Sequence, residues 1–523
     1  MDMDSIKRWL WHLGIGWLVC FPAPTVAQVV ELDQGFVRGL SESRVHVYQG
    51  IPYAAPPIGH LRWQPPQPLP AWEDTLNADT FSAGCVQDVV GSRPPWTEEF
   101  MHQGGVSEDC LYLNVWTQAE YSEQPKPVLV YIHGGAFQEG SGSVAVYDGS
   151  RLAQKGLVVV TINYRLGILG FFAHPDLSAD SPHQASGNYG LLDQVAALQW
   201  VKKNIAAFGG DPENVTVAGQ SAGAMSVFLL AASPLAKGLF QRVIAQSGPG
   251  GLASFGLSDL RSVAIPLSDA EEAGREYVAN HNLLSVQEMR MMTTNELSSL
   301  PSVRFFPVID GVLVTGDVSA IYDRGLQHQV PMMTGFNADE GSAFPGYGRT
   351  TLEEYQKSAH ERYEDEGDLF LSLYPADSDM AAGIAQKSSL RDLAAVALER
   401  LAAVHARSSG EDVYLYYFER AIPWPERPEF GAFHTAEVPY FFGTLDHLDR
   451  PLTEVDKLIS DTMSDYWVNF ATSGSPNGAD IPLWPSFREG EVQFLKFGSK
   501  VEPITLTENS KSKFFNEYLS RSQ

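Results

Sequence analysis

The stretch NVTVAGQSAGAMSVFLL, residues 214–230, reads as a strand, a very tight turn and a helix. Ser221 stands at the turn between Gly219 and Gly223, in a Gly-x-Ser-x-Gly frame that occurs once in the chain. A turn of this kind lifts the serine hydroxyl clear of the sheet, and the glycines let the neighbouring chain approach where a Cβ would clash. The stretch therefore predicts a strand followed by a helix with a candidate nucleophile between them. A plain turn serine is the alternative.

Three further apolar runs have the composition of buried strands. They are PVLVYI (127–132), LVVVTI (157–162) and RVIAQSG (242–248), and each is short, rich in Val and Ile, and bounded by turn residues. Residues 188–208 carry apolar side chains at helical spacing, and a glycine pair follows them. Strands that alternate with helices predict an α/β fold, with a central, mostly parallel sheet covered by helices on both faces.

The second half of the chain is expected to extend the same sheet. QVPMMTGFN (329–337) and DVYLYYFER (412–420) are further strand candidates. Residues 345–411 between them are mostly polar and helix-like, which indicates a cap or insertion. Because there is no internal repeat and no low-complexity linker, we expect one domain over residues 28–523 rather than several separable domains.

The N-terminus is typical of an export signal. Lys7 and Arg8 precede a short apolar run, and the small-residue sequence TVA, ending at Ala27, offers a cleavage site. Residues 1–27 are therefore predicted to be a signal peptide, with a buried N-terminal helix as the alternative, and the protein is expected to be secreted or periplasmic. No later run is long and apolar enough to predict a membrane span in the mature chain.

Charge and motif content exclude several classes of function. The formal net charge of −27 disfavours contact with phosphate backbones, so nucleic acid is not an expected partner. The chain has no His-Glu-x-x-His, no Cys-x-x-Cys and no EF-hand loop. We therefore expect no metal site and no cofactor. Oligomeric state is not predicted by any of these features.

The three cysteines are Cys20, Cys85 and Cys110. Removal of the signal peptide leaves a pair that an oxidising compartment would allow to bridge. In the chain-entropy model such a bridge stabilises the fold by roughly 3 kcal/mol. Two buried free thiols are the alternative.

A serine hydroxyl needs a base, and in this architecture an acid and then a histidine follow the serine in chain order. His434 lies in EFGAFHTAEVPYFFG after a predicted strand, where it could overhang the sheet edge; a structural histidine is the alternative. The loop after VPMM offers Asp339 and Glu340 as the acid. The loop YIHGGAFQEGSG (131–142) resembles those whose backbone N–H groups stabilise an oxyanion, although it could be only a tight turn.

These motifs resemble the type-B carboxylesterases of the cholinesterase-like α/β-hydrolase family. The resemblance extends over nearly the whole mature chain and keeps the family's order of motifs. The stretches that carry it are YQGIPYAAPPIGHLRWQPP (48–66), SEDCLYLNVW (107–116), YIHGGAF (131–137), NYRLGILGFF (163–172), GNYGLLDQVAALQWVKKNIAAFGGDPENVTVAGQSAGA (187–224), FFPVIDG (305–311), NADEGSAF (337–344) and GAFHTAEVPYFF (431–442).

The resemblance implies the α/β-hydrolase fold, with cap insertions, and hydrolysis of small-molecule carboxylic esters through an acyl-serine. It implies that Ser221 is the nucleophile and that His434 is the general base. It also implies that Glu340, rather than Asp339, is the acid of the triad.

Further roles follow from the same resemblance. The backbone N–H groups that it assigns to an oxyanion hole are those of Gly135, Ala136 and Ala222. It implies a disulfide between Cys85 and Cys110, which agrees with the redox argument. Ser247 falls where the family often has a serine near the triad.

The chain departs from cholinesterases at two positions. In cholinesterases a glutamate precedes the nucleophile, and a tryptophan in the disulfide loop helps to hold a quaternary ammonium group. Here Gln220 precedes the serine, and Trp96 lies at a different spacing from Cys110. We therefore expect a general esterase rather than a choline-specific one. The alternatives are a non-catalytic adhesion or binding protein of the same fold, or a lipase or amide- or carbamate-cleaving hydrolase with the same triad.

Overall fold

The computed structural model describes residues 25–119, 122, 124–253, 256–281, 283, 285–301, 303–488 and 491–521. Most of the expected signal peptide lies outside these residues. Its last three residues begin strand β1 (Thr25–Leu32), so the predicted cleavage after Ala27 falls inside this strand. The register of β1 with its neighbour β2 (Gly35–Glu42) shifts between Val26 and Val29. The pairs from Val29 to Leu32 lie beyond the predicted cut and would remain.

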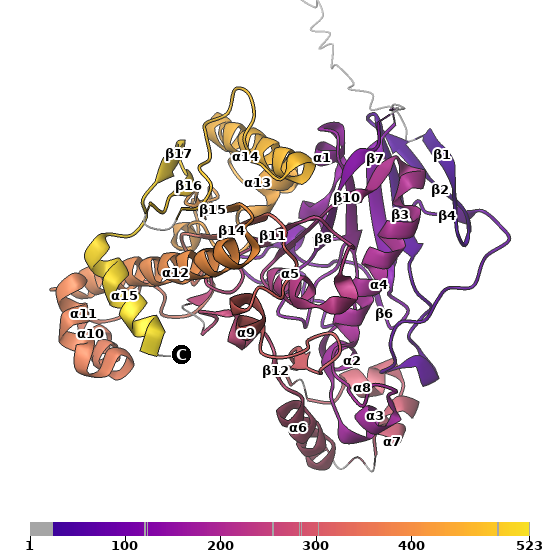
Figure 1. Ribbon diagram of the computed structural model, residues 1–523, viewed down its shortest axis with the longest axis horizontal. Helices are drawn as coiled ribbons and strands as arrows, with labels where there is room; N and C mark the ends of the chain where they lie inside the picture. Colours follow the sequence, from indigo (N-terminus) through magenta and orange to yellow (C-terminus); the bar gives the residue numbers. More distant parts are fainter. Residues whose placement is uncertain are drawn as a thin grey trace, which may run out of the picture.

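One sheet of 13 strands dominates the described part of the chain (Figure 1). From one edge to the other its order is β1, β2, β3 (Val45–Pro52), β7 (Tyr112–Gln118), β9 (Val158–Ile162), β8 (Lys126–Ile132), β10 (Gly210–Gln220), β11 (Arg242–Gln246), β14 (Met332–Asn337), β15 (Val413–Phe418), β16 (Phe494–Phe497) and β17 (Val501–Ile504), with β4 (Leu76–Asn77) beside β2. The pairings from β9 to β16 are all parallel, and antiparallel strands form both edges. The predicted α/β class with a mostly parallel centre is confirmed.

The six strands expected from apolar runs are all present within a few residues of their predicted limits. β10 begins at Gly210, four residues before the predicted run, where it pairs with Lys126 of β8. β11 ends at Gln246 because Ser247 has a positive φ of 49°, which an extended strand does not accommodate. The predicted helix at 188–208 is α4 (Tyr189–Asn204) followed by one 3₁₀ turn, Ile205–Phe208.

Helices cover the sheet in two groups (Figure 1). Helix α5 (Ala222–Ala232) packs on β10, β11 and β8, with α4 beside it. Helix α14 (Glu454–Ser473) packs on β10 and β8 next to α13 (Val438–Phe442), and α1 (Ser150–Gln154) packs on β3, β7 and β9. β8 in the middle is buried over its last five residues, as its continuous apolar run requires.

The polar, helix-like segment predicted as a cap forms α10 (Leu352–Tyr363), α11 (Gly367–Leu373) and the long helix α12 (Asp379–Ser409). The C-terminal helix α15 (Asn509–Arg521) packs against α11 and α12 (Figure 1). A second apolar cluster, which includes Tyr363, lies between these helices.

The other α-helices of the described residues lie outside the sheet and its covering layers. They are α2 (Gly167–Phe171), α3 (Pro175–Asp180), α6 (Leu267–Asn280), α7 (Val286–Met291), α8 (Thr294–Ser298) and α9 (Val318–Asp323). None of the helices in the described ranges has a stretch long and apolar enough to cross a membrane. The expectation of one domain over residues 28–523 stays a prediction.

Candidate active site

Ser221 lies at the turn between β10 and α5, at the carboxyl edge of the parallel strands. Its backbone angles, φ 58° and ψ −120°, are strained for any residue other than glycine. Two hydrogen bonds hold this conformation: Ser221 N–H donates to the Gln246 carbonyl (2.9 Å), and the Ser221 carbonyl accepts from Met225 N–H (3.0 Å). The adjacent strand and the first turn of α5 therefore keep the serine side chain at the sheet edge.

Sterics explain the two glycines that flank Ser221. A Cβ on Gly219 would lie 2.5 Å from the carbonyl group of Gly223, and a Cβ on Gly223 would lie 2.0 Å from the carbonyl oxygen of Ile132. Real Cβ atoms do not approach other heavy atoms this closely. Both positions therefore need glycine because the turn packs backbone against backbone, as the sequence predicted.

His434 and Glu340 form a buried hydrogen-bonded pair. His434 Nδ1 lies 2.5 Å from Glu340 Oε2, and the two side chains are 14% and 6% exposed. The other carboxylate oxygen, Oε1, accepts from Asn337 N–H at 2.8 Å. Because both carboxylate oxygens are engaged, the orientation of Glu340 toward His434 is determined from two sides.

Asp339, the other candidate for the acid, faces a different set of partners. Its Oδ1 contacts Lys387 Nζ (3.1 Å) and Arg391 Nη2 (3.0 Å), and its Oδ2 accepts from Ala432 N–H (3.2 Å). The geometry therefore pairs Glu340, not Asp339, with the histidine, while Asp339 joins α12 to the loop before His434.

The charges around His434 raise its pKa. Burial by itself lowers the pKa, but the nearby charge and hydrogen bond of Glu340 outweigh burial, and Glu437 adds to their effect. Glu437 is itself fully buried, and burial together with the charge of Glu340 raises its pKa to about 7. An imidazolium at His434 is therefore favoured by two acidic side chains.

Gln220, the residue before Ser221, contacts the same histidine. Its side chain is buried, and Gln220 Nε2 lies 3.1 Å from His434 Nε2 and 3.4 Å from Nδ1. When His434 Nδ1–H donates to Glu340, Nε2 is left as an acceptor that the Gln220 amide can reach. The structure thus brings His434 to the residue adjacent to Ser221, a contact that the sequence motif did not reveal.

The glycine-containing loop after β8 lies directly against the serine turn. A Cβ on Gly134 would come within 3.0 Å of the Ser221 Cβ. Gly135, Ala136 and Phe137 have successive positive φ values of 102°, 54° and 61°. The Gly135 carbonyl accepts from the N–H groups of residues 138 and 139, at 2.9 and 3.1 Å, which holds the loop in this form.

Ala222 follows Ser221 directly in the chain. It is the first residue of α5, so its N–H lacks an acceptor within the helix. The helix dipole also favours negative charge at this end. Gly135, Ala136 and Ala222, the residues predicted for the oxyanion hole, therefore belong to two segments that meet at Ser221.

Two buried residues behind the His–Glu pair were not found by sequence reasoning. Asn337 Nδ2 donates to the carbonyl of Phe433 at 2.8 Å and also to a carboxylate oxygen of Glu437. Glu437 accepts from Gln246 Nε2 at 3.4 Å as well. Both residues lie inside motifs quoted for the resemblance, but only their packing shows that they surround the pair.

Ser247 is buried, and its N–H donates to the Gly335 carbonyl at 2.9 Å. Its side chain also forms a hydrogen bond with the buried hydroxyl of Tyr416. Its placement near the triad as a functional residue stays a prediction.

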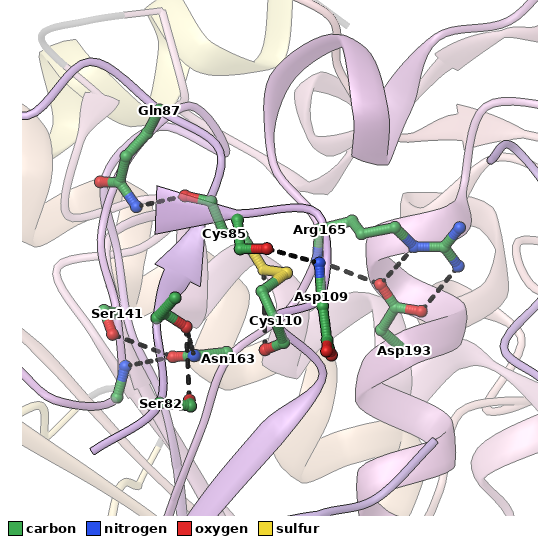
Figure 2. The surroundings of a disulfide bond; sticks show 12 residues. Ser82, Cys85, Gln87, Asp109, Cys110, Ser141, Asn163, Arg165 and Asp193 are labelled. Carbon is green, nitrogen blue, oxygen red and sulfur yellow. Dashed lines mark hydrogen bonds and ion pairs between the residues drawn. A yellow bond between two sulfur atoms is a disulfide. The ribbon is translucent and has the colours of Figure 1, made fainter. Parts of the chain in front are cut away.

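The predicted disulfide is present. Cys85 and Cys110 are bonded, with their Cα atoms 5.0 Å apart. Figure 2 shows Gln87 beside Cys85 and, close by, the buried ion pair of Arg165 and Asp193, whose Nη2 and Oδ1 lie 2.7 Å apart. Among the described residues no group of three or more His, Cys, Asp or Glu side chains is placed to hold a metal ion. The expectation that no cofactor is needed stays a prediction.

A serine on a strained strand–turn–helix, at the carboxyl edge of a parallel sheet, defines the class of the α/β-hydrolases. A family model described as "Carboxylesterase family" matches residues 26–516, and the chain belongs to that family. It is 39% identical over 520 residues to the fumonisin B1 esterase of Sphingopyxis macrogoltabida, covering 93% of this chain and 91% of that protein. It is 35% identical over 496 residues to the para-nitrobenzyl esterase of Bacillus subtilis (strain 168), covering 91% and 95%. The protein is a carboxylesterase.

Proposed function

We propose that the protein hydrolyses carboxylic esters with a triad of Ser221, His434 and Glu340. The observation that carries this proposal is the 2.5 Å contact between His434 Nδ1 and Glu340 Oε2, beside the strained turn of Ser221. An acid that accepts from Nδ1–H keeps the proton on that nitrogen, so Nε2 carries the lone pair that a general base needs. The steric need for glycine on both sides of the serine supports the same assignment, because such a close-packed strand–helix turn is typical of the nucleophile in this class of fold.

The proposed reaction has two steps, and His434 serves as the base in each. Ser221 Oγ attacks the ester carbonyl carbon while His434 Nε2 takes the hydroxyl proton. The C–O bond to the alcohol then breaks, and His434 returns the proton to the leaving oxygen, which leaves an acyl-serine. Water, activated by the same histidine, attacks the acyl carbon and releases the carboxylic acid. Glu340 stabilises the imidazolium in both steps, in keeping with the raised pKa of His434.

The N–H groups of Gly135, Ala136 and Ala222 would stabilise the tetrahedral oxyanion. The loop that carries the first two lies against Ser221, and the third stands at the N-terminus of α5. Loss of one such donor typically costs about 3 kcal/mol of transition-state stabilisation. Preorganised backbone donors are also independent of pH over the working range, because amides do not titrate there.

The substrate is proposed to be a general small-molecule ester rather than a choline ester. Gln220 places a neutral amide beside His434, where a carboxylate would add a negative charge to attract a cation. The two relatives are named for different esters, fumonisin B1 and a para-nitrobenzyl ester. A panel of p-nitrophenyl esters from acetate to palmitate, together with butyrylthiocholine, measures the preference; a strong preference for the thiocholine ester contradicts the proposal.

Replacing Ser221 by alanine tests the mechanism. We expect the Ser221→Ala protein to melt at the wild-type temperature but to lose hydrolysis of p-nitrophenyl butyrate and labelling by a fluorophosphonate. Undiminished hydrolysis by this variant would falsify the assignment of the nucleophile.

We propose that the protein is exported and that residues 1–27 are its signal peptide. The Cys85–Cys110 disulfide supports this proposal, since structural disulfides persist in oxidising compartments. Cleavage after Ala27 would leave the regular part of the β1–β2 ladder, from Val29 to Leu32, intact. N-terminal sequencing of the protein recovered outside the cytoplasm tests the site, and an unprocessed Met1 there contradicts it.

A further inference from the structure

The loop closed by the disulfide, residues 85–110, contacts the candidate active site at two separate places. Its neck is held by the disulfide, by the short parallel pairing of β5 (Gly84–Cys85) with β6 (Val106–Ser107), and by a hydrogen bond from Gly84 N–H to the Gly105 carbonyl at 2.9 Å. From this neck the loop reaches to His434 and to the loop that carries Gly135. The path of the loop therefore joins two parts of the site that are far apart in the chain.

Trp96 is the residue of the loop that reaches His434. Its indole Nε1–H donates to the His434 carbonyl at 3.0 Å and to Thr435 Oγ1 at 2.9 Å. Its ring stands edge-on to the imidazole, with centroids 6.5 Å apart and planes at 87°. The polar atom of Trp96 is thus hydrogen-bonded to the backbone of the histidine and to the side chain of the residue that follows it.

The backbone that Trp96 holds is strained. Thr435 has a φ of 85°, a conformation that a β-branched residue adopts only when its surroundings impose it. The residue on the other side of the histidine, Phe433, is packed edge-to-face on Phe100 of the same loop, with ring centroids 5.5 Å apart. Residues 433–435 are therefore held by the disulfide loop from both sides of His434.

The same loop is attached to the loop that carries Gly135. Gln87 exchanges two hydrogen bonds with the backbone of Gly140, donating to its carbonyl at 2.8 Å and accepting from its N–H at 2.7 Å. The Arg93 guanidinium lies 5.5 Å from the ring centre of Trp96 and forms an ion pair with Glu139. Arg93 and Trp96 are also joined by reciprocal backbone hydrogen bonds of 2.7 and 2.9 Å.

We propose that Trp96 is a positioning residue for catalysis. Residues 85–110 then form a brace, which fixes the position of His434 relative to the loop that carries Gly135. This inference rests on the proposed function, because it assigns Trp96 a role through His434. Trp96 acts through its N–H group on the His434 carbonyl and the Thr435 hydroxyl together, and its removal changes the position of the base rather than the affinity for substrate. The turnover number should therefore respond more than KM.

The replacement Trp96→Phe removes the indole N–H and keeps an aromatic ring. Trp72→Phe is the matched control, because Trp72 Nε1 donates to a backbone carbonyl, that of Phe36, at 3.0 Å, in the edge hairpin of the sheet. The test compares kcat and KM of the full-length proteins with p-nitrophenyl butyrate, with active sites counted by fluorophosphonate labelling. For Trp96→Phe we expect kcat to fall at least tenfold and KM to stay within twofold. Trp72→Phe should stay within twofold of wild type in both.

Thr435→Val provides a second, independent test, since it removes the Oγ1 acceptor and keeps the side-chain shape. We expect a severalfold loss of kcat at unchanged melting temperature. The double variant should lose no more than Trp96→Phe alone, because Trp96→Phe already removes the hydrogen bond that Thr435→Val deletes. If Trp96→Phe does not fold, Thr435→Val still decides the question.

Three results overturn the brace: wild-type kcat in Trp96→Phe, a raised KM with unchanged kcat, or wild-type kcat in Thr435→Val. The second would make Trp96 a wall of the substrate site instead. The test also separates this proposal from the proposed function. An inactive wild-type protein refutes the ester-hydrolase mechanism and the brace with it, whereas an active wild type with an equally active Trp96→Phe refutes the brace alone.

Discussion

Replacing Glu437 by glutamine tests how the charge of this buried acid affects the stability of the fold and the pKa of His434. Glu437 is completely buried, and its two oxygens accept from Asn337 Nδ2 and Gln246 Nε2. Glutamine keeps the volume but presents one N–H₂ group where the carboxylate had an oxygen. The side-chain amide of Gln246 carries both a donor and an acceptor, so a rotation of this amide can present its Oε1 to the new N–H₂ group. The substitution therefore removes the charge and leaves the new N–H₂ group with an acceptor.

The effect of this charge on stability depends on pH. Burial and the charge of Glu340 raise the pKa of Glu437 from 4.5 to about 7. Below pH 4.5 the carboxyl is protonated in both the folded and the unfolded chain, so burial has no ionisation cost. As the pH rises from 4.5 to 7 the unfolded chain ionises first and folding becomes less favourable, by about 3 kcal/mol once both states are ionised. Glutamine has no such cost.

The assay is thermal unfolding of Glu437→Gln and wild type at pH 5 and pH 8. For a chain of this length the unfolding entropy is about 1 kcal/mol per kelvin, so 3 kcal/mol corresponds to roughly 3 °C. We expect the variant to gain about 3 °C over wild type at pH 8 and much less at pH 5. A gain that is equal at the two pH values, or a loss that is larger at pH 8, refutes this reasoning.

Activity gives a second reading of the same variant. The charge of Glu437 contributes to the raised pKa of His434, so its removal should move the acid limb of kcat/KM toward lower pH. Glu399→Gln is the matched control: Glu399 lies on α12, and burial and the charge of Asp392 raise its pKa to about 7 as well. It should show a stability change of the same sign, with the acid limb unmoved. If the acid limb of the kcat/KM profile shifts in both variants, the shift comes from a general change of the fold and not from the charge of Glu437.

The remaining predictions concern the acid and the disulfide. Glu340→Gln should lower kcat about 10³–10⁴-fold, because an amide beside His434 Nδ1 favours the wrong tautomer of the histidine. Asp339→Asn should keep most of the activity and lower the stability. Equal losses of kcat in the two variants would contradict the assignment of Glu340 as the acid. Removing both Cys85 and Cys110 should lower the free energy of unfolding by about 3 kcal/mol in urea titrations, and an unchanged midpoint would argue against the stabilising role.

The strands and the serine turn could be predicted from the sequence because their signals are local. A buried parallel strand is a continuous apolar run, and β8, β9 and β15 were found in this way. Limits were less accurate where a distant partner decided them. β10 starts earlier than expected because Gly210 pairs with Lys126 on another strand, which no local pattern of apolar residues records.

The choice between Asp339 and Glu340 illustrates the limit of the pattern. An argument from spacing cannot distinguish two adjacent carboxylates on one loop, and only the resemblance favoured Glu340. The structure separates them by their partners, since Asp339 faces Lys387 and Arg391 on α12 while Glu340 faces His434. No sequence pattern singled out Glu437. An acidic residue next to apolar residues can lie on the surface or in the interior, and only the packing shows that Glu437 is buried.

By itself the sequence determined the class of fold and the tight strand–helix turn that carries one serine between two glycines. These properties depend on backbone sterics and on the periodicity of apolar side chains, which act between near neighbours. Only the tertiary structure decided which groups hold His434: Glu340 lies 94 residues away from it and Trp96 lies 338 residues away. A hydrogen bond requires atoms to meet within about 3 Å, and for residues so far apart in the chain the folding of the whole sheet determines that distance.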